Sequence, residues 1–179
     1  MTVKNPKCLA IDADVARASG GKDAIYPKPK LCRDFLNEVY KLGHSMIVTD
    51  DIYEEWRNHR SDHARIWYRQ MVQRGKINRH RGNTHNDTLR EKIARVVEKN
   101  AIKSVLKDMR WIEAALLVDK IVASSDERMR GHLSNAAQKI SELTVIVWVN
   151  PSDANENCIF WLRQSAPPES FRQLGYTPK

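Results

Sequence analysis

Short apolar runs that alternate with longer segments of helical periodicity constrain this chain more than any other feature of its sequence. Each run is too short for an ordinary helix, and most are rich in β-branched residues, which is typical of strands. The runs lie at residues 8–12, 45–49, 121–125 and 144–149. Strands that alternate with helices predict a parallel sheet. We therefore expect an α/β fold with three layers, α/β/α, around a mainly parallel, twisted sheet of four to five strands.

The segment 107–127 shows how this alternation brings distant residues together. Asp108 opens a predicted helix with apolar residues at three- and four-residue steps, and a β-branched run then leads to Asp126. Such a helix runs antiparallel to the strand that it feeds, so the helix start and the strand end lie at the same edge of the sheet. We therefore expect Asp108 and Asp126 to converge. Two converging carboxylates repel each other unless one is protonated or a cation lies between them.

Two more acids are expected at this edge, because the ligand sites of parallel α/β sheets lie beyond the carboxyl ends of the strands. Asp12 ends the first strand, and Glu55 lies about a turn and a half into the helix after the second. Glu54 is the alternative to Glu55 if that helix is shifted by one residue. Carboxylates without His or Cys ligands favour Mg²⁺ or Mn²⁺. The predicted catalytic and metal-binding residues are Asp12, Glu55, Asp108 and Asp126.

These acids stand in motifs that resemble those of the PIN domain nucleases. The motifs are Ile11-Asp12-Ala13-Asp14-Val15, Thr49-Asp50-Asp51-Ile52-Tyr53-Glu54-Glu55, Asp108-Met109-Arg110-Trp111-Ile112-Glu113-Ala114-Ala115 and Ile121-Val122-Ala123-Ser124-Ser125-Asp126. The resemblance covers roughly residues 8–150, with Glu55 in the position of the family's glutamate and Ser124 where the family carries Ser or Thr. A basic helical insertion at about 60–104 is long for the small toxin members of the family.

The resemblance implies a metal-dependent endoribonuclease that hydrolyses single-stranded or structured RNA, with Mg²⁺ or Mn²⁺ as its cofactor. It also raises the hypothesis that the chain is the toxin of a toxin-antitoxin pair. The partners to be expected are then an RNA substrate, an antitoxin protein and, in a homodimer, a second copy of the chain. Supporting roles beside the metal are predicted for Asp14, Ser124 and Glu127.

Two other functions are compatible with the same residues. Asp12-Ala13-Asp14 is similar to the motif of the haloacid-dehalogenase phosphatases, with Asp12 as nucleophile and Asp14 as acid and base. Ala16 departs from that motif, which has Thr or Val there, and a convincing Gly-Asp metal motif is lacking. The second alternative is a PIN-like scaffold that binds RNA or a protein without cutting.

The charge distribution favours a polyanionic partner. The net charge is +8 and the pI is about 9.5. We name residues 56–82 the basic tract, because they hold eight basic residues against one acid. The arginines predicted to contact nucleic acid are Arg57, Arg60, Arg65, Arg69, Arg79 and Arg81. Trp67 and Tyr68, which are interleaved with them, belong either to the core or to the RNA surface.

The remaining features of the sequence concern its domains, its cysteines and its location in the cell. We expect one nuclease domain at residues 1–150 and a C-terminal helix and tail at 151–179, with little to bury after residue 165. Three cysteines without paired spacing predict buried thiols. No apolar run approaches a membrane span and no signal region follows the N-terminal lysines, so we expect a cytoplasmic protein without membrane contact. Glu113 and Asp119 are predicted to be surface groups.

Overall fold

A single five-stranded sheet forms the centre of the protein in the computed structural model, which describes residues 2–20 and 27–178. The strand order is β3-β2-β1-β4-β5, and every neighbouring pair is parallel. The strands are β1 (Cys8–Ile11), β2 (Ser45–Val48), β3 (Ile77–Arg79), β4 (Ile121–Ala123) and β5 (Val147–Val149). The α/β prediction is confirmed, and the basic segment after Gly75 supplies a further strand, β3, at the edge of the sheet.

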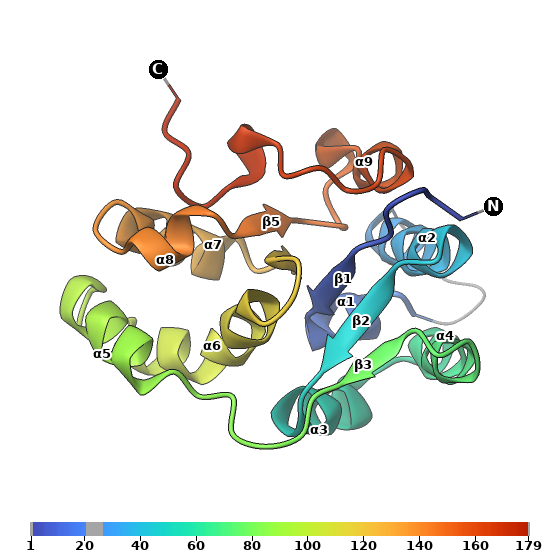
Figure 1. Cartoon of the computed structure of the whole chain (residues 1–179), viewed down its shortest axis with the longest axis horizontal. Coiled ribbons are helices and arrows are strands. Elements are labelled where there is room, and N and C mark those ends of the chain that lie inside the picture. The colour runs from blue at the N-terminus through green and yellow to red at the C-terminus, as the bar shows by residue number, and fades with distance from the viewer. Residues whose placement is uncertain (1, 21–26, 179) are drawn as a thin grey trace.

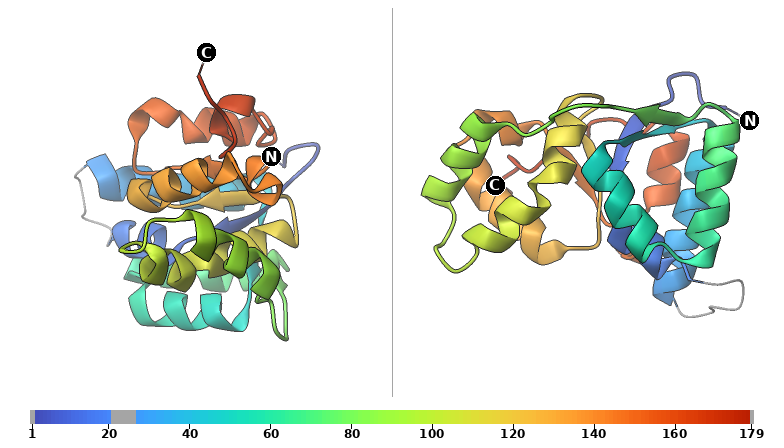
Figure 2. Two further views of the ribbon diagram at one scale, coloured as in Figure 1. Left: turned by 90° about the vertical axis from the view of Figure 1, so that its left-hand side faces the viewer. Right: turned by 90° about the horizontal axis from the view of Figure 1, so that it is seen from below.

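Helices cover both faces of this sheet (Figures 1 and 2). The helices are α1 (Ala13–Ala18), α2 (Pro27–Leu42), α3 (Asp50–His59), α4 (Asp62–Gln73), α5 (Asp87–Val96), α6 (Ile102–Leu116), α7 (Glu127–Ala137), α8 (Ser141–Thr144) and α9 (Cys158–Arg163), with 3-10 turns η1 (Ala154–Glu156) and η2 (Ser170–Arg172). Helices α2, α4 and α9 lie on one side of the sheet, and α5, α6, α7 and α8 lie on the other (Figure 1). The result is the expected three-layer α/β/α arrangement. None of the helices in the described ranges is long and apolar enough to cross a membrane.

Local sequence explains where the helices of the first half begin and end. The Thr49 hydroxyl accepts a hydrogen bond from the Ile52 amide at 3.3 Å and caps α3, and the Ser61 hydroxyl caps α4 in the same way through Ala64. Gly43 ends α2 in the left-handed region (φ +81°), where a side chain would also meet Thr2. These capping signals are visible in the sequence, because each acts through residues close to the helix end.

The core holds the strands and a cluster of aromatic side chains. Every residue of β1, β4 and β5 is buried, which suits strands covered on both faces. Trp56, Trp67 and Tyr68 form a buried cluster, in which the ring centroid of Trp56 lies 5.6 Å from that of Trp67 and 5.9 Å from that of Tyr68. Trp56 also donates a hydrogen bond to the carbonyl oxygen of Ile11 at 2.7 Å. Of the two interpretations of Trp67 and Tyr68, the structure supports the core.

The predicted start of the helix at Asp108 was wrong. Helix α6 begins at Ile102, so Asp108 lies in its second turn and caps nothing. The earlier turn forms because Val105 is buried and continues the apolar period of Met109 and Ile112 toward the N-terminus. Ala101 at the N-cap makes no side-chain hydrogen bond, so no capping side chain fixes the start of α6. The buried face of the helix fixes it instead.

The C-terminal part also differs from its prediction. Residues 144–146 end α8 and form a turn, and β5 begins only at Val147. The tail is packed on the sheet: Leu174 and Ala166 are buried, and Gln173 pairs with Val147 in an isolated antiparallel bridge. The tail therefore covers the edge of β5. It buries more than its composition suggested, because a sheet edge offers backbone partners to any neighbouring segment.

Candidate active site

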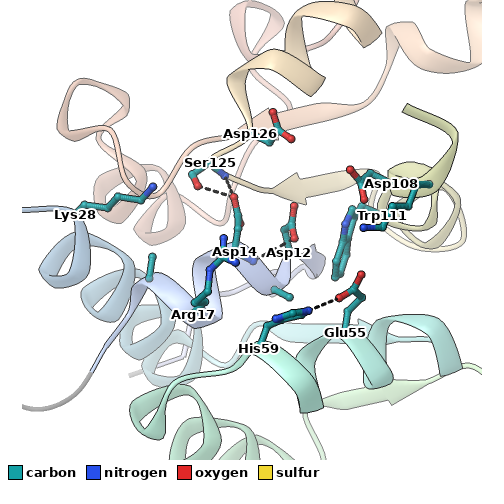
Figure 3. Close-up of a pocket in the computed structure, with 13 residues that line it drawn as sticks. Asp12, Asp14, Arg17, Lys28, Glu55, His59, Asp108, Trp111, Ser125 and Asp126 are labelled. Atoms are coloured by element: carbon teal, nitrogen blue, oxygen red, sulfur yellow. Dashed lines mark hydrogen bonds and ion pairs between the residues drawn. The ribbon is translucent and has the colours of Figure 1, made fainter. Parts of the chain in front are cut away.

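The four predicted acids line one cavity of about 500 Å³ at the carboxyl ends of the strands (Figure 3). Asp12 follows β1, Glu55 lies in α3, Asp108 lies in α6, and Asp126 follows β4 as the N-cap of α7. Four separate chain segments thus supply one carboxylate each. The cavity is lined by Asp12, Ala13, Asp14, Arg17, Ala18, Lys28, Glu55, His59, Lys107, Asp108, Trp111, Ser125 and Asp126.

Asp12 is held in place by hydrogen bonds from two neighbouring segments. Its Oδ1 accepts a hydrogen bond from the Asp14 amide at 3.2 Å, and its Oδ2 accepts one from the Ser124 hydroxyl at 2.8 Å. Burial, followed by the charge of Asp14, raises the pKa of Asp12 to about 7. A carboxyl group whose charge is this costly has a strong tendency to bind a proton or a cation.

Asp14 lies beside Asp12 and is fixed by the loop after β4. Its Oδ2 accepts hydrogen bonds from the Ser125 amide at 2.9 Å and the Ser125 hydroxyl at 2.5 Å. Its Oδ1 is buried and has no hydrogen-bond partner among the described residues. Ser124, which is completely buried, orients Asp12. Two of the three residues with a predicted supporting role, Asp14 and Ser124, therefore lie against the predicted ligand Asp12.

Glu55 is the glutamate that faces the cavity. Its carboxylate forms an ion pair with Arg110 at 3.1 Å, and it also lies 3.1 Å from Nε2 of His59. Glu54, the alternative, does not line the cavity and forms an exposed ion pair with Arg57 at 2.8 Å. The Arg110 contact joins α3 to α6, the helix that carries Asp108. Figure 3 shows Glu55 and His59 together on the α3 side.

Asp108 and Asp126 approach the cavity from α6 and from the start of α7. Asp126 is partly occupied as a cap, since its Oδ1 accepts a hydrogen bond from the Met129 amide at 2.8 Å. Burial raises the pKa of Asp108, while the neighbouring Lys107 and Arg110 oppose that rise and the charges of Asp126 and Glu55 add to it. The acids therefore influence one another across the cavity, as expected for carboxylates that face a common space.

The donor set fits a hard divalent cation, although its members stand apart. Within the described residues, no three His, Cys, Asp or Glu side chains form a group that holds a metal ion directly. Carboxylates that share a cavity without a cation repel one another, and the charge of Asp14 adds to burial in raising the pKa of Asp12. Carboxylate oxygens, including the unpartnered Oδ1 of Asp14, are the ligands that Mg²⁺ and Mn²⁺ prefer. The residues present are thus suited to such an ion by their chemistry.

Several residues of the site have no predicted role in the sequence. These are Arg17, Lys28, His59, Lys107, Arg110, Trp111 and Ser125. A periodic signal existed for some of them. Arg17 and Trp111 stand three residues after Asp14 and Asp108, and His59 stands four residues after Glu55. Such spacings place side chains on the same face of a helix.

Other predicted residues lie outside the cavity. Glu127 does not line it and contacts Arg130 at 3.4 Å and the Asn150 side chain at 2.9 Å. None of the six arginines assigned to nucleic acid lines the cavity. Glu113 was wrongly expected at the surface: it is buried and bound by Arg90 at 2.6 and 2.7 Å. Asp119 is exposed, as predicted, and accepts a hydrogen bond from the Cys8 amide at the start of β1.

Comparison of the chain with protein-family models, with curated proteins and with solved structures gives no match. The function therefore has to be inferred from the site alone.

Proposed function

We propose that this protein is a metal-dependent endoribonuclease of the PIN domain type, which hydrolyses phosphodiester bonds of single-stranded RNA. The observation that carries the proposal is the meeting of Asp12, Glu55, Asp108 and Asp126, from four chain segments, in one cavity with basic residues at its rim. Acids without basic residues beside them would repel RNA. Acids with a divalent cation and flanking basic residues are the usual means of cleaving a phosphodiester.

The chain's own residues would orient the reaction. Asp12, Asp108 and Asp126 would hold Mg²⁺ or Mn²⁺, and Ser124 would keep the Asp12 carboxylate turned toward it. Arg110 and His59 would fix Glu55 as the fourth acid. The divalent ion, when bound, supplies activation of a water and stabilisation of developing charge. Hydrolysis at this site would break the bond between phosphorus and the 3′-oxygen, and its products would carry a 5′-phosphate and a 3′-hydroxyl.

The test is cleavage of a labelled single-stranded RNA by purified protein with Mn²⁺, Mg²⁺ or EDTA. Two pairs of neighbouring acids, each with one member inside the cavity and one outside it, distinguish loss of the site from a general effect of removing a negative charge. Asp126→Asn and Glu55→Gln are expected to abolish cleavage, whereas Glu127→Gln and Glu54→Gln are expected to leave it unchanged, since those two side chains lie outside the cavity. The product ends distinguish this enzyme from a contaminating metal-independent ribonuclease, which leaves a 2′,3′-cyclic phosphate or a 3′-phosphate. Full metal-dependent activity in both cavity variants would refute the site.

The two alternative functions have their own outcomes in the same preparations. A phosphatase of the haloacid-dehalogenase type would trap a phosphate mimic on Asp12 and would use Asp14 as acid and base, but Oδ2 of Asp14 is bound by Ser125 and its Oδ1 is buried. A non-catalytic scaffold would bind RNA without cutting it, and Asp126→Asn would leave its cellular phenotype intact. Action as a cytoplasmic toxin, with an antitoxin partner, is a further part of the proposal and is tested by the growth experiment described below.

A further inference from the structure

Three basic side chains at the rim of the cavity are candidates for binding the substrate backbone. Arg17 of α1, Lys28 of α2 and Lys107 of α6 line the cavity and are exposed. None of them forms an ion pair or a side-chain hydrogen bond within residues 2–20 and 27–178. Figure 3 shows Arg17 and Lys28 on the side of α1 and α2, with Asp108 of α6 on the opposite side. Unpaired basic residues therefore flank the acids on both sides.

The arginines of the basic tract are in a different situation. Most of them already have local partners: Arg57 pairs with Glu54, Arg65 pairs with Asp62, Arg79 pairs with Asp50 and lies over the Tyr53 ring, and Arg60 lies over the Tyr68 ring. An arginine that is already paired releases less free energy on binding a phosphate, because its ion pair must first be broken. The tract is thus basic in sequence but partly neutralised in the folded chain.

A second, smaller cavity adjoins the main cavity at two of the acids. It has a volume of about 130 Å³ and shares Asp108 and Asp126 with the main cavity. Arg128 and His132 of α7 also line it, and the buried Nε2 of His132 has no hydrogen-bond partner among the described residues. The volume exceeds the about 30 Å³ of one liquid water and is below the roughly 300 Å³ of a small-molecule site. A phosphate group is of suitable size for such a space.

We propose that single-stranded RNA crosses the site from Arg17 and Lys28, over the acids, to Lys107 and Arg128, and that the basic tract is not its binding surface. This inference rests on the proposed nuclease function and specifies how that site holds its substrate. A chain bound on both sides of the acids presents an internal phosphodiester to them. The path therefore accounts for cutting within a strand, because neither side of the acids requires a chain end.

Binding can be measured without cleavage, which separates this inference from the nuclease proposal. The background is full-length Asp12→Asn protein in EDTA, and the probe is a fluorescein-labelled single-stranded RNA of mixed sequence. Anisotropy titrations at several salt concentrations give the slope of log K against log salt. Each phosphate that the protein no longer neutralises lowers the magnitude of that slope by about 0.7 for a single strand. The double variants Arg17→Gln with Lys28→Gln and Lys107→Gln with Arg128→Gln are each expected to lower it by about 1.4.

The matched control is Arg65→Gln with Arg69→Gln, which removes the same charge from the exposed face of α4. We expect its slope to equal that of the background, and thermal melting identifies any variant that no longer folds. A reduced slope in the control together with unchanged slopes in the two cavity variants would overturn the path. That outcome would leave the nuclease proposal standing if Mn²⁺-dependent cleavage by wild type persisted. Absence of cleavage by wild type, together with the expected slopes in all three variants, would refute the nuclease proposal and leave the binding path standing.

Discussion

The charge of Asp12 is expected to destabilise the cation-free protein in a pH-dependent way, and Asp12→Asn removes that charge. The pKa of Asp12 is raised from 3.8 to about 7 in the folded chain. The folded state therefore binds the proton more tightly than the unfolded state, and stability is lost as the pH rises from about 4 through about 7. Asn imitates the neutral acid, because its side chain can still cap α1 and meet the Ser124 hydroxyl.

The magnitude follows from the shift of about three pKa units at about 1.4 kcal/mol each. Asp12→Asn is expected to be more stable than wild type by about 2 kcal/mol at pH 5 and by about 4 kcal/mol at pH 8, both in EDTA. At this chain length, 4 kcal/mol corresponds to roughly 8 to 16 °C in melting temperature.

Urea unfolding and thermal melting at several pH values between 5 and 8.5 measure this difference. Asp87→Asn is the control, since Asp87 is exposed in the first turn of α5, and its effect should be small at every pH. A stability gain that stays constant across the pH range, or no gain at pH 8, would refute the idea that Asp12 carries a costly buried charge.

Four further outcomes are expected. Mn²⁺ should raise the melting temperature of wild type by mass action, and Asp126→Asn should abolish that rise, as measured by thermal shift with and without EDTA. Glu113→Ala should lower the free energy of unfolding, measured in urea, by about 3 to 5 kcal/mol, because it leaves Arg90 without its buried partner. A decrease below about 1 kcal/mol would contradict this. Burial lowers the pKa of His44, so its neutral form contributes stability above about pH 6.5 that is lost on acidification, and His44→Gln should lose less between pH 7 and 5. If the chain is a toxin, wild type should be harder to express without a partner than the Asp12→Asn variant, because cells that make wild type grow more slowly. Equal growth of the two cultures would argue against a toxin but not against a nuclease.

The sequence by itself determined the parts of this protein that depend on neighbouring residues. Short β-branched runs become strands, and capping residues such as Thr49 and Ser61 begin helices, because both effects act over a few residues. The carboxyl ends of parallel strands must share one edge of the sheet. For that reason Asp12 and Asp126, which follow two neighbouring strands, could be assigned to one site from their positions alone.

Only the tertiary structure decided which way the helical residues face and where each helix starts. Asp108 reaches the cavity from the middle of α6, because the burial of Val105 lets that helix begin at Ile102, before its predicted start at Asp108. The orientation of α3 against α6 selects Glu55 over Glu54 and pairs it with Arg110. These outcomes depend on packing between segments that are distant in sequence, and a local pattern carries no information about that packing.

Tertiary structure also decided which basic residues lie unpaired beside the acids. The basic tract is conspicuous in sequence, but Arg57 and Arg65 pair with acids three residues earlier in their own helices, and folding pairs Arg79 with Asp50 and places all three arginines outside the cavity. Arg17 and Lys107 are inconspicuous in sequence, yet the fold leaves them exposed at the cavity rim. The number of charges is a property of the sequence, whereas which of them remain unpaired beside the acids is a property of the three-dimensional arrangement.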